Sequence, residues 1–125
     1  MPVTIPTGTL LYHGSDTPEI PNYPEWLSVD PEHSYLFCGV SPLFPPADLS
    51  ASEKGCWFLT FVTTRPLKLL YFDGSSGAKM TGGPLDTQDL ITWGEIREDL
   101  HGKERERIDA LCKWGKEYGL DGFLR

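Results

Sequence analysis

Prolines place the strongest limit on the fold of this chain, because proline lacks the backbone N–H that helices and central strands use. Seven of the 11 prolines fall between positions 18 and 46: Pro18, Pro21, Pro24, Pro31, Pro42, Pro45 and Pro46. No long helix fits between them. The stretch therefore predicts short elements joined by ordered turns.

Strands are expected where apolar, aromatic and β-branched residues gather. The clearest signal is CWFLTFVT at residues 56–63, which Arg65-Pro66 ends. Further strands are expected at residues 9–13, 25–29 and 67–72. Residues 120–125 have the composition of a turn that leads into one more strand.

Helices are expected in three places. At Asp30-Pro31-Glu32 the aspartate can cap, the proline suits the first helical position, and the glutamate complements the helix dipole. This helix is expected to run to about Cys38, and a second is expected at residues 85–93. The third covers residues 103–118, with Gly119 as its stop. Its apolar stripe consists of Ile108, Leu111, Cys112, Gly115 and Tyr118.

The fold class follows from the order of these elements. Strands occur in both halves of the chain without a regular βαβ alternation, which indicates an α+β fold rather than a doubly wound sheet. A length of 125 residues predicts a single domain over residues 1–125. Residues 39–55 and 73–84 are expected to be loops.

The charge balance excludes several partners. With 18 acidic and 11 basic residues the net charge is -7, whereas nucleic-acid binding requires a basic face. No basic run suits an anionic membrane surface, and no apolar run could span a bilayer. We therefore expect no nucleic acid and no membrane as partners. The N-terminal residues do not resemble a secretory signal.

The cysteines and histidines predict neither a disulfide framework nor a metal site. The three cysteines form no CxxC pair. The three histidines are isolated from one another, so no metal is expected. These features predict a reduced, cytoplasmic protein, although a mature secreted protein would look the same. No GxSxG or phosphate-binding glycine motif is present either.

Two early segments, LLYHGS (residues 10–15) and EWLSVDPEHSYLFC (residues 25–38), remain as the candidate site. A histidine followed by a bare glycine backbone at a strand end suits a flat amide ligand, because glycine permits close approach. Ser34 and Phe37 would share one face of the short helix. A hydroxyl and a ring are the groups that an aromatic amide can use.

Together these segments resemble the nicotinamide-binding half of ADP-ribosyltransferases of the diphtheria-toxin and poly(ADP-ribose) polymerase type. That family has a [WY]-H-G-[ST] motif at the end of its first strand. The resemblance implies that His13 binds the nicotinamide-side ribose and that the Gly14 backbone pairs with the carboxamide. Ser15 matches the small hydroxyl residue that follows. Trp26 stands at the tyrosine of the family's His-Tyr-Glu signature, so it joins His13 as a candidate catalytic residue.

The resemblance extends into the first helix. Ser34 matches the serine that bonds the carboxamide oxygen, and Phe37 matches the tyrosine that stacks on the ring. The chain departs from the family at two positions, with tryptophan at position 26 and phenylalanine at position 37 where the family has tyrosine. Both side chains can still stack on a ring, but neither has the tyrosine hydroxyl. No residue maps onto the family's catalytic glutamate, which lies on a strand after a DG turn. Glu95 is the only acid in a comparable setting, and its spacing does not match.

The resemblance implies an ADP-ribosyltransferase-like split antiparallel sheet with short flanking helices, lacking its last strand. It implies NAD as the substrate and, if a glutamate is supplied, transfer of ADP-ribose to a protein or other acceptor. A second interpretation is an inactive module that acts through protein contacts with a partner chain. A third is an NAD glycohydrolase, with water as the acceptor.

Overall fold

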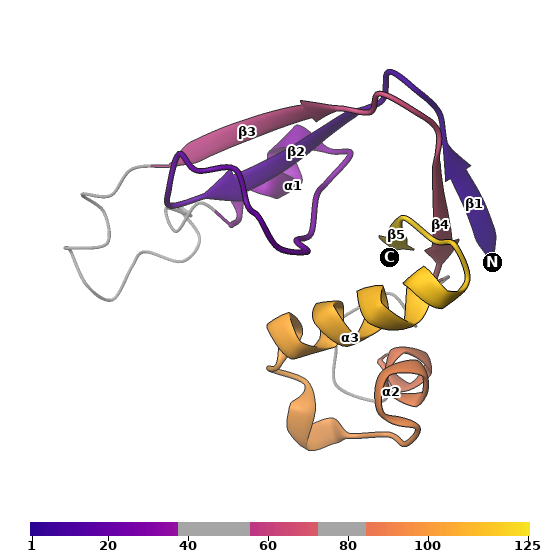
Figure 1. The fold of residues 1–125 in the computed structure, drawn as a ribbon. Coiled ribbons are helices and arrows are strands. Elements are labelled where there is room, and N and C mark those ends of the chain that lie inside the picture. The colour runs from indigo at the N-terminus through magenta and orange to yellow at the C-terminus, as the bar shows by residue number, and fades with distance from the viewer. Residues whose placement is uncertain (38–55, 73–84) are drawn as a thin grey trace, which may run out of the picture. The chain divides into compact units, whose positions relative to one another are not determined.

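The computed structural model describes residues 1–37, 56–72 and 85–125. The chain divides into two compact units. We call Thr7–Arg65 the central unit, and Met1–Pro6 together with Pro66–Arg125 the terminal unit (Figure 1). Both units combine strands with helices, which confirms α+β at this level. The loops expected at 39–55 and 73–84 lie outside the described residues.

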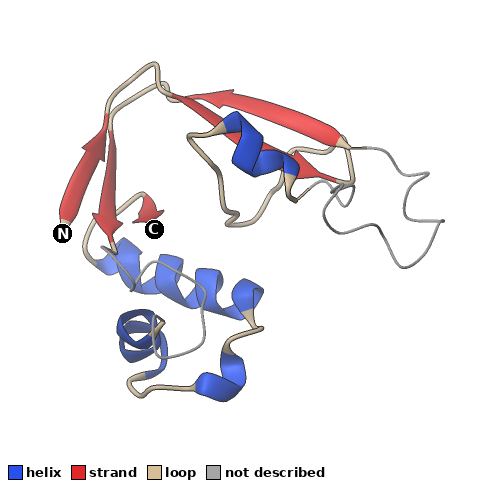
Figure 2. Cartoon of the chain, turned by 180° about the vertical axis from the view of Figure 1, so that it is seen from behind, coloured by secondary structure: helices blue, strands red, loops and turns tan. Residues whose placement is uncertain are grey.

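The central unit is built on an antiparallel strand pair, β2 (Leu10–Ser15) and β3 (Trp57–Val62). Helix α1 (Pro31–Tyr35) packs against β2 and covers one face of the pair (Figure 2). The helix start is confirmed: the Glu32 N–H donates to Asp30 Oδ1 at 2.9 Å, and Pro31 occupies the first turn. A local sequence signal thus positions α1.

Three boundaries in the central unit differ from expectation. Strand β2 does not end at His13 but continues to Ser15, because β3 pairs with it as far as Trp57. The strand expected at residues 25–29 is reduced to one bridge between Ser28 and Tyr12. The helix ends at Tyr35 rather than near Cys38, since its last turn tightens into i→i+3 bonds from the N–H groups of Leu36 and Phe37.

The terminal unit contains a three-stranded sheet in the order β1-β4-β5. Strand β1 (Pro2–Ile5), which the sequence did not predict, pairs antiparallel with β4 (Leu67–Tyr71). Strand β5 (Gly122–Leu124) runs parallel to β4. The expected split antiparallel sheet is therefore wrong at this parallel pair. Parallel neighbours need a long crossover, and residues between β4 and β5 include the helices.

These helices are α2 (Asp86–Trp93), the short 3₁₀ helix η3 (Glu98–Leu100) and α3 (Glu104–Glu117). Helix α3 packs against α2 and β5. At Gly115 an added Cβ would lie 3.1 Å from the Phe123 ring, so the bare backbone lets the strand approach the helix. The expected stripe holds for Ile108, Leu111 and Gly115, whereas Tyr118 is 64% exposed.

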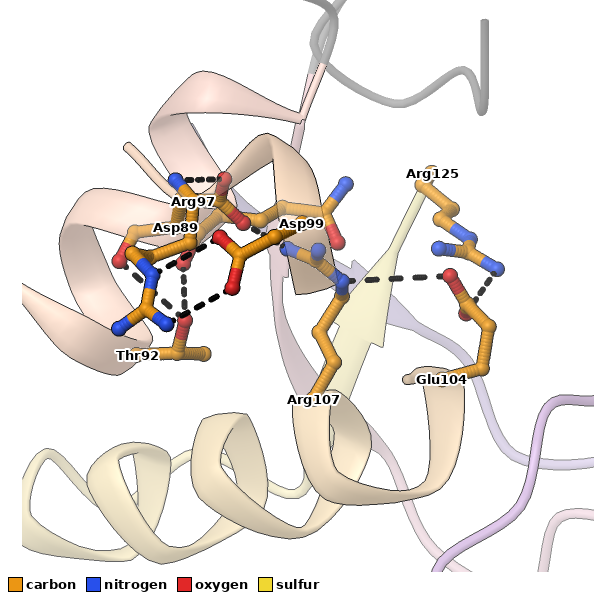
Figure 3. Close-up of polar contacts among 8 residues, drawn as sticks. Asp89, Thr92, Arg97, Asp99, Glu104, Arg107 and Arg125 are labelled. Carbon is orange, nitrogen blue, oxygen red and sulfur yellow. Dashed lines mark hydrogen bonds and ion pairs between the residues drawn. The ribbon is translucent and has the colours of Figure 1, made fainter. Parts of the chain in front are cut away.

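A buried ion pair joins α2 to α3 (Figure 3). Arg107 and Asp89 are both fully buried, and the Arg107 Nη1 donates to Asp89 Oδ1. Asp89 Oδ2 also accepts the backbone N–H of Arg97 at 2.9 Å. The Arg107 guanidinium lies 4.8 Å from the centroid of the Trp93 ring, which adds a cation–π contact. These contacts hold the two helices in one arrangement.

We expect Arg107→Met to lower the free energy of unfolding by about 3–5 kcal/mol, because it leaves the Asp89 carboxylate buried without its cation. Chemical denaturation followed by circular dichroism measures the change. Asp89→Asn in the same background should recover most of the loss, since an asparagine oxygen still accepts the Arg97 N–H. Arg97→Gln, which removes only exposed ion pairs, should change stability little. Equal losses for Arg97→Gln and Arg107→Met would contradict this interpretation.

The cysteines differ from expectation in one respect. Cys56 is disulfide-bonded, so the expectation of fully reduced cysteines is wrong at this residue. Cys112 on α3 is free and half-buried, and burial is the main cause that raises the pKa of its thiol. Among the described residues, no helix is long and apolar enough to cross a membrane.

Iodoacetamide should therefore distinguish the two cysteines. Cys112 should react more slowly in the folded protein than after unfolding, because a raised pKa leaves less thiolate at a given pH. Cys56 should react only after reduction. Peptide mass mapping under native, denaturing and reducing conditions gives the readout. Modification of Cys56 in the unreduced, unfolded chain would refute the disulfide.

Candidate functional site

The backbone of β2 presents one edge to β3 and the other edge away from it. Thr63 N–H donates to the Thr9 carbonyl at 3.0 Å, so odd-numbered residues of this segment bond toward β3. Tyr12 instead exchanges two bonds of 2.8 Å with Ser28 on the opposite side. Hydrogen-bonded pairs alternate along an antiparallel ladder. Gly14, two residues after Tyr12, therefore turns its N–H and C=O to the same edge as Tyr12.

Trp26 lies where the ladder would pair with Gly14, since it is two residues before Ser28. Its backbone groups are bonded elsewhere: the N–H donates to Glu25 Oε1 at 2.9 Å, and the C=O binds His13 Nδ1 at 3.0 Å. No backbone or side-chain partner of Gly14 on this edge is present within residues 1–37, 56–72 and 85–125. A donor and an acceptor thus lie next to each other on a buried glycine.

The bond between His13 and Trp26 also fixes the histidine tautomer. A carbonyl oxygen can only accept, so Nδ1 of His13 carries the proton. In the neutral ring Nε2 is then an acceptor. His13 is thus prepared to accept a hydrogen bond from a ligand hydroxyl.

Ser34 is the most unusual side chain on α1. It is only 1% exposed, and its Oγ has no hydrogen-bond partner in the part of the chain that is described. A buried hydroxyl left unsatisfied costs about 1–3 kcal/mol. Because α1 packs against β2, Ser34 belongs to the same unit as Gly14. A ligand that binds this hydroxyl would remove the cost.

An aromatic stack holds α1 on the strands. The Phe58 ring lies between Tyr12, with centroids 5.4 Å apart, and Tyr35, with centroids 4.8 Å apart. Phe58 lies opposite Gly14 in the ladder. The stack therefore fixes the helix that carries Ser34.

The remaining predicted residues take different positions. Phe37 is 61% exposed, and its ring makes a T-shaped contact with His33 at 5.6 Å between centroids, so a planar ligand can reach it. Ser15 uses its hydroxyl locally, since Oγ accepts the Thr17 N–H at 3.1 Å. Glu95 belongs to the terminal unit and pairs with Arg97.

The structure thus brings His13 and Trp26 into direct contact and places Gly14 and Ser34 on packed elements. Two contributors were missed from the sequence. Ser28 pairs with Tyr12, and Glu25 binds the Trp26 N–H. Both residues belong to the segment that pairs with β2 at Tyr12. The register of this pairing cannot be read from the sequence alone.

Comparison with known proteins gives the family of this chain. Residues 1–44 and 45–125 match the YPL277C N-terminal domain. The chain belongs to this family. Two Saccharomyces cerevisiae proteins are similar to it over 99% of its length: the uncharacterized protein YPL277C, 36% identical, and the uncharacterized protein YOR389W, 35% identical. The chain spans only 32% and 25% of these relatives, and no solved structure matches it.

For this YPL277C N-terminal domain we expect nitrogen NMR to report His13 protonated at Nδ1 and unprotonated at Nε2. The measurement is made in a buffer alkaline enough that the imidazole is neutral. A long-range ¹H–¹⁵N spectrum distinguishes the tautomers. His33, whose ring makes an edge contact with Phe37, serves as the reference. An Nε2–H tautomer at His13 would contradict the bond to Trp26.

Proposed function

We propose that the central unit binds the nicotinamide end of NAD, as an ADP-ribosyltransferase-like domain does. The proposal is carried by two observations within the described residues: the Gly14 backbone has no hydrogen-bond partner on the edge away from β3, and the buried Ser34 hydroxyl on the packed helix α1 has none either. A primary carboxamide offers one acceptor and two donors. Its oxygen can accept from the Gly14 N–H while its NH₂ donates to the Gly14 C=O.

The other groups suit the rest of the ligand. The exposed Phe37 ring can stack on a pyridinium. The Nε2 of neutral His13 can accept a ribose hydroxyl. Trp26 contributes through its backbone carbonyl, which orients His13. In these roles His13 and Trp26 would position the ribose next to the nicotinamide–ribose bond that a transferase breaks.

Cleavage of that bond leaves a cationic sugar that a carboxylate must stabilise. Transfer of ADP-ribose to a protein acceptor therefore requires a carboxylate in addition to these binding groups. With this carboxylate the whole protein would act as a transferase, or as an NAD glycohydrolase if water is the acceptor. Without it the domain would be a binding module.

The module interpretation has an observation of its own. Phe58, Thr60 and Val62 of β3 turn their backbone groups away from β2, and among the described residues no strand pairs with this edge. Open edges accept a further strand from a partner. Incubation with labelled NAD separates the alternatives. Release of nicotinamide supports an enzyme, while binding without release supports a module.

Nicotinamide binding tests the proposal directly by ligand-observed NMR and calorimetry. We expect Ser34→Ala to weaken nicotinamide binding about tenfold, the value of one lost hydrogen bond. The free energy of unfolding should not fall, because this hydroxyl has no hydrogen-bond partner to lose among residues 1–37, 56–72 and 85–125. Thr64→Ala, which removes an exposed hydroxyl of the same unit, is the matched control and should bind normally.

Two results would overturn the proposal. One is no binding of nicotinamide or NAD at millimolar concentration to the folded protein. The other is equal affinity of wild type and Ser34→Ala.

A further inference from the structure

We propose that Glu25 makes this site selective for a positively charged carboxamide ring, an N-alkylated pyridinium, over neutral nicotinamide. The inference rests on the proposed function, since it concerns the charge of the ligand that lies against Gly14. It assigns to Glu25 the role of a specificity-determining residue.

The position of Glu25 follows from a single backbone residue. Trp26 donates its N–H to Glu25 Oε1 and binds His13 through its C=O. The two backbone groups of one residue lie only a few ångströms apart, so the carboxylate and the imidazole lie within about 10 Å of each other. In register, Trp26 faces Gly14. The carboxylate is thereby held near the edge where the carboxamide would bind.

The hydrogen bond limits how far the carboxylate can move. Glu25 is half-buried and its bond to Trp26 is partly shielded from solvent. A partly buried charge is screened less by water and salt than an exposed one. Its effect on a nearby cation is therefore stronger than that of a carboxylate on the surface.

The net charge of the central unit also favours a cationic ligand. Residues 7–65 contain seven acidic and two basic residues, a net charge of -5 out of the -7 of the whole chain. Residues 7–37, which supply His13, Gly14, Glu25 and Ser34, contain no lysine or arginine. A field of this sign attracts a cationic ring. Neutral nicotinamide gains nothing from it.

The experiment compares nicotinamide with 1-methylnicotinamide, which has the same carboxamide on a ring with a fixed positive charge. In wild type we expect the cation to bind about tenfold more tightly than the neutral ring. Glu25→Gln should remove most of this difference while nicotinamide affinity changes by less than about twofold. A glutamine oxygen still accepts the Trp26 N–H, so the backbone is preserved.

Glu19→Gln is the matched control. Glu19 is exposed in the same unit and makes no ion pair or hydrogen bond within the described residues. The Glu19→Gln substitution removes one negative charge from the central unit, as Glu25→Gln does, so it reports the effect of net charge alone. We expect it to retain the preference for 1-methylnicotinamide. Calorimetry gives the affinities, and thermal unfolding confirms that both variants are folded.

Different outcomes overturn different claims. If neither ligand binds, the proposed function and this inference both fail. If nicotinamide binds but the cation has no advantage, or if Glu25→Gln and Glu19→Gln reduce the advantage equally, only the inference fails. Loss of binding of both ligands in a folded Glu25→Gln variant also contradicts it, because a charge effect would spare the neutral ring.

Discussion

The candidate site depends on the point where residues 26–28 leave strand β2. Ser28 pairs fully with Tyr12, whereas Trp26, two residues earlier, bonds to His13 and Glu25 instead of Gly14. If the pairing continued to Trp26, its backbone would hydrogen-bond the N–H and C=O of Gly14, and these groups would not be available to a ligand amide. The same divergence fixes the His13 tautomer and holds the Glu25 carboxylate. A single interrupted strand pair therefore positions the backbone groups and the carboxylate of the candidate site.

The two units are stabilised by different means. Of the buried aliphatic side chains among the described residues, most belong to the terminal unit, which also contains a fully buried ion pair. In the described part of the central unit, Leu11 is the one buried large aliphatic side chain. Its helix is held by the Tyr12–Phe58–Tyr35 stack and by backbone bonds instead. This stack fixes the helix whose Ser34 hydroxyl has no hydrogen-bond partner among the described residues.

Local signals were enough to predict much of the fold. The cap and proline at Asp30-Pro31 located α1, and the apolar run before Arg65 located β3. Non-local pairing was not predictable. The parallel β4–β5 pair depends on how the helical crossover returns the chain. Strand β1 has only four residues, one of them a proline, so it does not stand out in the sequence. At the site, residue types indicated His13, Gly14 and Ser34, but the roles of Glu25 and Ser28 depend on register across β2.

Recognition of a carboxamide and cleavage of its bond to ribose make different demands on a carboxylate. Glu25 Oε1 accepts the Trp26 N–H, and leaving that bond would free the backbone that orients His13. Glu25 is therefore suited to attract a cationic ring, because a charge acts at a distance without moving. Orientation of an acceptor hydroxyl requires direct contact with the ribose. In a transferase built on this site, the residue that makes that contact must be a carboxylate other than Glu25.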